Sequence, residues 1–310
     1  MGFERRLPRL SEVEGGSGYL QVLLSELTLA PRPGGGILLE LRIAPELFCL
    51  ASPAERGAVQ PELDVEEGRE VETLVERLRR DGGADPVAVH LERFRFRHAS
   101  AGILPRLVHS GRELVLLFHR DIQPVGWNIA NGASASVDEM ADIGRLMRRE
   151  AAEEVLLFEG GGIVTLAGES SKDAHRAVTE WRRRLGAVAG REAKVRWDMG
   201  PDALRVDLPG GPPVLTEGLH IGLHADDFGI ECSRACSIEC SEDAIPLDGE
   251  LAGDSLLDRP AGLFTWDGVR REPPRPKAVH RGGRPMTEPP FTTLPRLCPV
   301  TAGLLAAIRS

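Results

Sequence analysis

The succession of strand-like segments, a loop and a helix in residues 18–157 most constrains the fold of this chain. Five segments are rich in Val, Leu, Ile or Phe and have lengths typical of strands. They are residues 18–30, 37–44, 87–98, 103–108 and 113–119. A loop at 121–137 and a helical pattern from about 138 to 157 follow, and another helical pattern occupies residues 71–80. Strands and helices in this order predict a mixed α/β domain.

The second half of the chain continues this mixture. Residues 170–173, Ser-Ser-Lys-Asp, have the pattern of a capping box and predict a helix to about residue 185, with Trp181 on its apolar face. Four further strand-like segments are residues 193–199, 204–208, 219–224 and 230–238. Residues 273–295 are rich in Pro, Arg and Gly, so we expect an extended, poorly packed segment there, followed by a helix at 301–308.

Composition indicates a globular protein. Of the 310 residues, 42% are hydrophobic and 27% are charged, which is close to the globular average. The net charge of -9 argues against nucleic acid as a main partner, because a polyanion needs a basic face. No segment approaches the roughly 20 consecutive apolar residues of a membrane helix, and we see no secretory signal. The odd cysteine count, 5, suits reduced thiols, so we expect a cytoplasmic protein without a membrane partner.

Three acidic residues in the helical segment 138–157 give the strongest chemical signal. Glu150, Glu153 and Glu154 fall within an arc of roughly 100° on a helix. Carboxylates crowded in this way repel each other, so this face is either fully solvated or holds a cation. Oxygen ligands suit hard ions such as Mg²⁺ or Mn²⁺. We expect Arg149 to pair with Glu153 at i,i+4 and to orient that side chain.

The loop before this helix strengthens the metal interpretation. Gly132 closes a loop of sequence Trp-Asn-Ile-Ala-Asn-Gly that begins at Trp127. Asp138 and Glu139 open the helical segment, where the helix dipole favours carboxylates. An acidic helix by itself is more often a solvated face, but a glycine loop and an acidic pair directly before it favour a site.

Loop and helix together resemble the Nudix box. That pattern is a glycine, five residues, Glu, seven residues, Arg-Glu, an apolar residue, any residue, Glu-Glu, any residue and Gly. Residues 127–132 resemble the Trp-x-Leu-Pro-Gly-Gly lead-in of the family, and residues 149–154 keep the Arg-Glu-apolar-x-Glu-Glu half intact.

The first half of the box departs from the family pattern. Asp138 stands where Glu is usual, ten residues instead of seven separate it from Arg149, and Leu156 replaces the closing glycine. On a continuous helix, Glu139 and Asp142 would project about 20° and 80° from Glu150, on the side where Glu153 lies. Either residue is therefore an alternative to Asp138 as the first acid of the box.

The resemblance implies an α/β fold with a Nudix-like mixed sheet sandwiched by helices. On this interpretation residues 1–97 form an N-terminal extension of strands and a helix. Residues 98–270 form the Nudix-like domain with an insertion at 160–213, and residues 271–310 form a Pro-rich tail with a terminal helix. Insertions in this family cover the substrate cleft or build a dimer contact, so the resemblance is compatible with a homodimer.

The resemblance also implies a Mg²⁺- or Mn²⁺-dependent pyrophosphohydrolase that cleaves the diphosphate of a nucleotide or of a nucleoside-diphosphate conjugate. The metal-ligand candidates are Glu150, Glu153, Glu154, Asp138 and Glu139, the catalytic candidates are Glu153, Glu154 and Arg149, and the substrate-binding candidates are Trp127, Gly132, Arg120 and His119. A second interpretation is a Nudix-like module that senses a nucleotide without cleaving it. A third is a structural protein whose acidic helix is coincidental.

Some residues outside the box are further candidates. A general base is expected from a later loop, where the available acids are Glu231, Glu239, Glu242 and Glu250. Regular four-residue spacing occurs in two further groups, Cys232, Cys236 and Cys240, and His220 and His224. A structural role is the stronger interpretation of both groups, because zinc and iron–sulfur sites show tighter cysteine pairs and need a fourth ligand.

Overall fold

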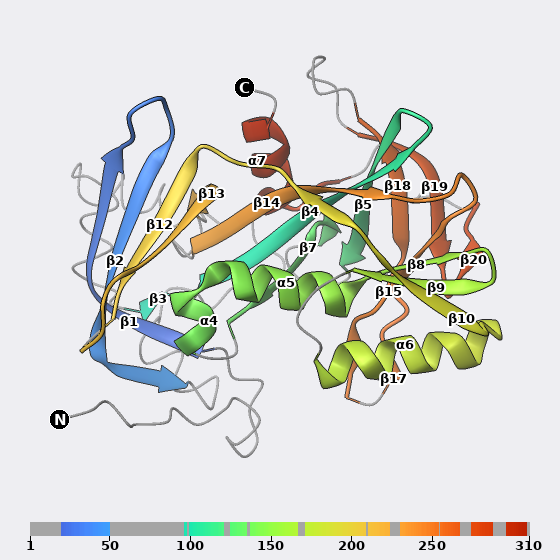
Figure 1. Cartoon of the computed structure of the whole chain (residues 1–310), viewed down its shortest axis with the longest axis horizontal. Helices are drawn as coiled ribbons and strands as arrows, with labels where there is room; N and C mark the ends of the chain where they lie inside the picture. Colours follow the sequence, from blue (N-terminus) through green and yellow to red (C-terminus); the bar gives the residue numbers. More distant parts are fainter. Residues whose placement is uncertain are drawn as a thin grey trace, which may run out of the picture. The chain divides into compact units, whose positions relative to one another are not determined.

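The computed structural model describes residues 20–49, 96–97, 99–120, 125–134, 137–166, 171–208, 210–223, 230–253, 255–266, 274–287 and 296–308. These residues form a mixed α/β fold with a large mixed sheet and few helices (Figure 1). The predicted mixture of strands and helices is thus confirmed. The helix expected at 71–80 and most of the strand expected at 87–98 lie outside the described residues.

Strands outnumber helices along the described parts of the chain. In sequence order the elements are β1 (Leu20–Pro31), β2 (Ile37–Cys49), β3 (Phe96–Arg97), β4 (Ala99–His109), β5 (Arg112–Arg120), β6 (Gly126–Asn128), β7 (Ala130–Ala133), α4 (Val137–Ala141), α5 (Ile143–Glu154), β8 (Val155–Glu159), β9 (Gly162–Leu166), α6 (Lys172–Leu185), β10 (Ala189–Ala193), β11 (Val195–Trp197), β12 (Asp202–Asp207), β13 (Val214–Leu223), β14 (Ile230–Glu239), β15 (Ile245–Asp248), β16 (Leu251–Ala252), β17 (Ser255–Leu256), β18 (Ala261–Thr265), β19 (Arg275–Arg281), β20 (Arg284–Pro285) and α7 (Pro299–Ile308).

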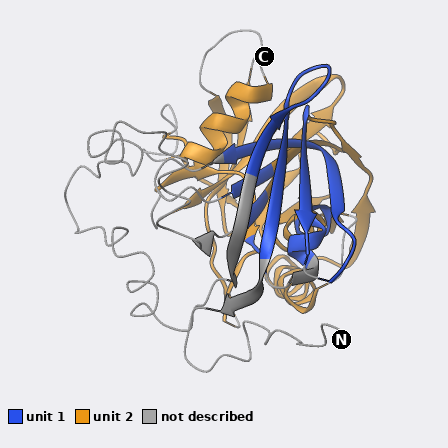
Figure 2. Cartoon of the chain, turned by 90° about the vertical axis from the view of Figure 1, so that its left-hand side faces the viewer, with its two compact units in different colours: residues 1–101, 133–146, 201–232 blue, residues 102–132, 147–200, 233–310 orange. Residues whose placement is uncertain are grey.

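The chain forms two compact units that interleave along the sequence (Figure 2). Unit 1 contains residues 1–101, 133–146 and 201–232, and unit 2 contains residues 102–132, 147–200 and 233–310. Strands β4, β7 and β14 and helix α5 therefore have residues in both units. The predicted domain boundaries at residues 97 and 270 stay a prediction.

In unit 1 the strands follow the order β3-β1-β2-β12-β13. Strands β1 and β2 form an antiparallel hairpin, whereas β12 runs parallel to β2, so the sheet is mixed. Leu39, Leu41 and Ile43 of β2 are buried while Arg42 is exposed, as alternation in a half-buried strand requires. Leu204 of β12 pairs with Leu39, which extends this buried face to the next strand.

The prediction of a single helix at 138–157 is wrong in two respects. The helical segment is divided into α4 and α5, and the chain enters strand β8 directly after Glu154. The break lies at Asp142, whose carboxylate accepts a hydrogen bond from the backbone N–H of Arg145 at 3.3 Å, as an N-cap does. Because Glu139 precedes this break, its position cannot be projected from the helix that carries Glu150.

In unit 2 the main strands follow the order β20-β19-β18-β5-β4-β14. The short strands β6 and β7 pair with β5 and β4, so part of the loop expected at 121–137 is in fact extended and hydrogen-bonded to the sheet. The expectation of poor packing at 273–295 is wrong for β19, which pairs with β18 and buries Val279.

A second sheet of unit 2 has the order β10-β9-β8-β15, and helix α6 packs on it (Figure 1). The helix begins within the capping segment expected at 170–173, with Ser171 as N-cap accepting a hydrogen bond from the backbone N–H of Ala174. It ends at Leu185, close to its predicted end, with Gly186 as C-cap. Trp181 is buried against Leu156 and Leu247, as its place on the apolar face predicted. Residues 160–213, the expected insertion, thus supply β9, β10 and α6 to this layer.

The core of the main sheet in unit 2 is closed by helix α7. Leu304 and Leu305 of α7 pack in one cluster with Trp127, Ile129 and Phe264. The helix expected at 301–308 is therefore confirmed, together with its return to the domain.

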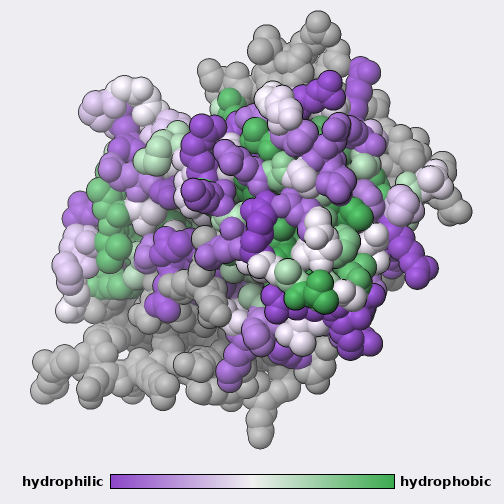
Figure 3. Space-filling model, turned by 45° about the vertical axis from the view of Figure 1, so that its right-hand side comes forward, coloured by the Kyte–Doolittle hydropathy of each residue, from purple (hydrophilic) through white to green (hydrophobic). Residues whose placement is uncertain are grey.

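Hydrophilic residues cover much of the described surface in the view of Figure 3, and hydrophobic residues appear there in separate patches. Large hydrophobic side chains that are exposed include Val188, Met199 and Leu215. Among the described residues, no helix has the length and apolar character needed to cross a membrane.

Candidate active site

The loop that begins at Trp127 is anchored in the core of unit 2. Trp127 is only 3% exposed and packs edge-to-face against Phe264, with ring centroids 4.8 Å apart, and against His119 at 5.4 Å. Aromatic pairs in this geometry stabilise beyond the area they bury. Trp127 therefore fixes where the following residues of the loop lie, and its predicted contact with substrate stays a prediction.

The loop meets the acidic helix at two points. The backbone N–H of Asn131 donates to Oε2 of Glu154 at 3.1 Å. At Gly132, an added methyl group would overlap the carboxylate of Glu150, so only glycine leaves space for that side chain. Both glutamates are 5% exposed. The two segments that carry the sequence resemblance are thus in contact, and their acids are not spread into solvent.

Arg149 holds the two acids next to it along the helix. Its Nη1 lies 2.8 Å from Oε1 of Glu150 and 2.7 Å from Oε2 of Glu153. The pair expected at i,i+4 is therefore present. Because one guanidinium nitrogen contacts both carboxylates, Arg149 fixes the orientation of both side chains. Its single positive charge balances only one of their two negative charges.

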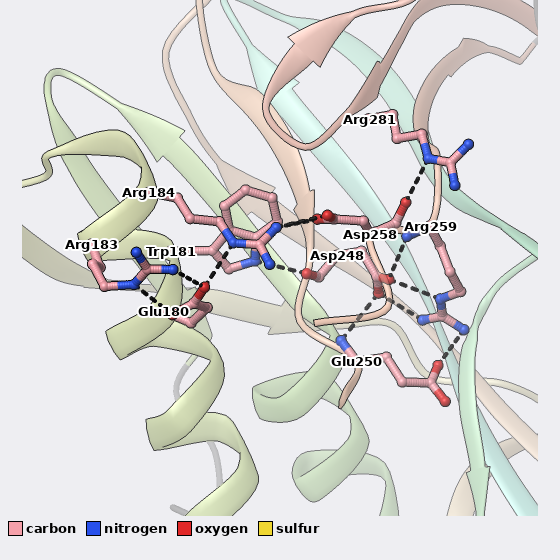
Figure 4. A network of polar contacts seen from close by, with 9 residues as sticks. All are labelled: Glu180, Trp181, Arg183, Arg184, Asp248, Glu250, Asp258, Arg259 and Arg281. Atoms are coloured by element: carbon pink, nitrogen blue, oxygen red, sulfur yellow. Dashed lines mark hydrogen bonds and ion pairs between the residues drawn. The ribbon is translucent and has the colours of Figure 1, made fainter. Parts of the chain in front are cut away.

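A second arginine, Arg259, lies in the segment between β17 and β18 and contacts Glu154, the third glutamate of α5. Its guanidinium forms two hydrogen bonds with the buried carboxylate of Asp248 and an ion pair with Glu250 (Figure 4). Its Nη2 also lies 3.3 Å from Oε1 of Glu154. The indole N–H of Trp181 donates to the backbone carbonyl of Asp248 at 2.8 Å. This hydrogen bond links helix α6 to the acidic cluster, which consists of Glu150, Glu153, Glu154, Asp248 and Glu250.

The acidic cluster disfavours full ionisation of Glu154. Burial raises the pKa of Glu154 well above its ordinary value, Arg259 lowers it, and the charges of Glu250 and Glu150 raise it again. A hydrogen bond between the side chains of Glu154 and Glu250 acts in the same direction. These surroundings favour the protonated form of Glu154 unless a further cation compensates the charge.

Glu250 is the one general-base candidate that the structure brings to this cluster within the described residues. Glu239 and Glu242 are exposed, and Glu242 lies 3.9 Å from His109. Glu231 belongs to unit 1, where it is buried and accepts a hydrogen bond from Ser100. The sequence offered no means to choose among these four acids, because the choice depends on β15 and the turn after it.

Asp138 and Glu139 lie on α4, which belongs to unit 1, and Glu139 is buried. Their predicted role as supporting ligands stays a prediction. His119 and Arg120 are half-buried at the end of β5, with the His119 ring against Trp127. Their predicted contact with substrate phosphates also stays a prediction.

The regularly spaced cysteines lie along or just after one strand. Cys232 and Cys236 are buried in β14, and Cys240 follows it. Burial raises the pKa of the Cys236 thiol to about 12 and that of Cys240 to about 11, so both are protonated near neutral pH. His220 is half-buried on β13, and His224 lies outside the described residues. In the described ranges, no three His, Cys, Asp or Glu side chains are arranged as metal ligands.

No protein-family model matches the chain, and a search of curated proteins gives no match. A functional assignment therefore depends on the geometry and charge of the acidic cluster.

Proposed function

We propose that this chain is a Nudix-type, metal-dependent pyrophosphohydrolase that cleaves the diphosphate of a nucleotide or of a nucleoside-diphosphate conjugate. One observation carries the proposal: the Trp127 loop and the glutamates of α5 lie in contact through Asn131, Gly132, Glu150 and Glu154. The resemblance joins two separate segments of sequence, and their contact in the fold is what a shared site requires. We also propose a cytoplasmic location and a small-molecule substrate.

The oxygen donors of these glutamates are of the type that a hard divalent ion prefers, although the described side chains are not arranged as metal ligands in this structure. Carboxylate oxygens of Glu150, Glu153 and Glu154 would hold Mg²⁺ or Mn²⁺, both of which prefer oxygen ligands. Together with Asp248 and Glu250 these are five acids against two arginines, so the formal charge is −5 + 2 = −3. A buried excess of negative charge needs protons or a cation.

The chain's own residues divide the remaining work. Arg149 orients Glu150 and Glu153, while the loop N–H of Asn131 orients Glu154. Glu250 is half-exposed beside Glu154, and we assign it as the acceptor of the proton from the attacking water. The ion, when bound, would offset charge on the phosphoryl oxygens and lower the pKa of a coordinated water.

One observation favours the second candidate function, a module that binds a nucleotide without cleaving it. Arg259 contacts Glu154, Glu250 and Asp248 and so already supplies a positive charge inside the cluster. A permanently bound guanidinium would reduce the demand for a metal ion. A binding module of this kind would be stabilised by its ligand without releasing a product.

The deciding experiment incubates the purified chain with a panel of dinucleotides, sugar nucleotides and ADP-ribose, with and without Mg²⁺. We expect Mg²⁺-dependent release of a nucleoside monophosphate from at least one of them. The double variant Glu153→Gln, Glu154→Gln should lose this activity and keep its fold. The control Glu192→Gln, exposed on β10, should match the wild type.

The outcomes separate the candidate functions. A rise in melting temperature with a nucleotide but no product would support the binding module. Wild-type activity in the double variant would contradict the role of the glutamates. A melting temperature that responds to neither divalent ions nor nucleotides would leave only a structural role.

A further inference from the structure

The segment before helix α7 is part of the loop's hydrogen-bonding scheme. Leu297 forms a parallel bridge with Trp127. The backbone N–H of Trp127 donates to the carbonyl of Arg296 at 2.8 Å, and the N–H of Cys298 donates to the carbonyl of Trp127 at 2.9 Å. Gly126, with φ of 144°, permits this approach, because a methyl group there would lie 2.6 Å from the Arg296 carbonyl oxygen.

Thr301, in the first turn of α7, holds the middle of the same loop. Its side chain is fully buried at 0% exposure. The hydroxyl oxygen accepts a hydrogen bond from the backbone N–H of Ile129 at 2.9 Å, and the hydroxyl donates to Oδ1 of Asn128 at 2.9 Å. Both the donor and the acceptor capacity of this hydroxyl are therefore used on the loop.

The hydrogen bonds continue from Asn128 to the acidic helix. Since the amide oxygen of Asn128 faces Thr301, its nitrogen points the other way and donates to Oδ1 of Asn131 at 2.8 Å. The backbone N–H of Asn131 in turn donates to Oε2 of Glu154. Asn128 is 3% and Glu154 is 5% exposed, so bulk water does not replace these partners.

We propose that Thr301 is a positioning residue for Glu154, so that helix α7 belongs to the site. The hydroxyl fixes the orientation of the Asn128 amide, the amide fixes Asn131, and Asn131 holds Oε2 of Glu154. Oxygen Oε1, which contacts Arg259 at 3.3 Å, would be the ligand atom for the ion. The inference rests on the proposed function, because it assigns Glu154 as a metal ligand. Hydrogen-bonded partners of ligands orient them in this way in metal sites generally.

The test compares Thr301→Val, which keeps the shape and removes the hydroxyl, with Thr301→Ser, which keeps the hydroxyl. Mn²⁺ binding to the whole chain is measured by electron paramagnetic resonance, and kcat and KM are measured separately. We expect Thr301→Val to bind Mn²⁺ about 10-fold more weakly, and Thr301→Ser to restore most of the affinity. The control is Thr179→Val on α6, where the exposed hydroxyl donates to the His175 carbonyl.

A second variant covers the case in which Thr301→Val does not fold. Asn128→Asp keeps the acceptor for Thr301 but has no side-chain N–H for Asn131, and it should weaken Mn²⁺ binding to the same degree. Equal Mn²⁺ affinity in the wild type and in a folded Thr301→Val or Asn128→Asp would overturn the role of Thr301 alone. A wild-type chain that binds no Mn²⁺ would overturn the proposed function together with it.

Discussion

Arg259 donates to both carboxylate oxygens of Asp248, with Nη2–Oδ1 at 2.7 Å and Nε–Oδ2 at 3.0 Å. Asp248 is only 2% exposed, and burial raises its pKa although Arg259 acts in the opposite direction. The pair therefore fixes a guanidinium beside Glu154 by a buried contact that does not itself involve Glu154. We infer that Asp248 sets the position of Arg259 in the cluster.

Replacing Asp248 with Asn should destabilise the fold, because it removes the charge that compensates a buried guanidinium. We expect a loss of roughly 2–4 kcal/mol in the free energy of unfolding, measured with urea. Asp258→Asn is the matched control, since Asp258 forms the corresponding pair with Arg184 at a more exposed position. That variant should lose less than about 1 kcal/mol. If both variants lost a similar amount of unfolding free energy, burial of Asp248 would not explain the effect of its replacement.

Gly132→Ala should disturb the site more than the fold. The added methyl group would overlap the Glu150 carboxylate, so this side chain must move away from the loop. We expect Mn²⁺ affinity to fall at least about 10-fold in a titration, with a smaller change in melting temperature. Gly222→Ala on β13 is the control, because no atom lies within 4 Å of its added Cβ. Unchanged Mn²⁺ affinity in Gly132→Ala would show that Glu150 does not need its present place.

Gly303→Ala should stabilise helix α7. Gly303 is an exposed interior residue of the helix, and no atom lies within 4 Å of the position that its Cβ would take. Alanine loses less backbone entropy than glycine on folding, so we expect a gain of about 0.5–1 kcal/mol in the free energy of unfolding. Urea denaturation measures it. A loss of stability would mean that the α7 backbone differs from the one described.

Glu159 should make stability depend on pH. Burial alone would raise the pKa of Glu159, but hydrogen bonds from Ser241 and Arg191 outweigh it and hold the pKa below its usual value. A lowered carboxyl pKa stabilises the fold above the pKa of the unfolded chain, and this contribution is lost as pH falls through the folded pKa. Glu159→Gln should therefore cost about 1 kcal/mol near pH 7, and this cost should shrink as pH falls from the pKa of the unfolded chain through the folded pKa.

The measurement for Glu159 is urea unfolding at a series of pH values. Glu192→Gln, at an exposed position of β10, should differ from the wild type by the same small amount throughout. If the loss in Glu159→Gln were equally large at low pH, the hydrogen bonds of the ionised carboxylate would not be its cause.

Local patterns predicted many of the elements, because propensity and capping act over a few residues. The N-cap of α6, Ser171, lies within the capping segment expected at 170–173. The last helix and the strands expected at 18–30, 37–44, 103–108, 113–119 and 230–238 lie near their predicted positions. The helix boundary at Glu154 was missed, since the Val-Leu-Leu-Phe run after it suits a helix or a strand equally. Pairing with β9 and β15 decides it, and this pairing is not local.

The sequence also predicted a site at the Trp127 loop and the three glutamates of α5, but it did not predict the residues that surround them. Arg259 and Asp248 reach the cluster from more than ninety residues further along the chain, and nothing in their spacing marks them. Thr301 looked like an ordinary helical residue. Its partner Asn128 is evident only when the main sheet has brought α7 beside β6.

Asn128 and Thr301 are 173 positions apart in the sequence. During synthesis on the ribosome, the nascent chain therefore exposes the Trp127 loop long before the hydroxyl that holds it has been translated. Residues added late to the growing polypeptide complete the loop, so a translation product that stops short of Thr301 contains every acid of the cluster without the contact that aligns one of them.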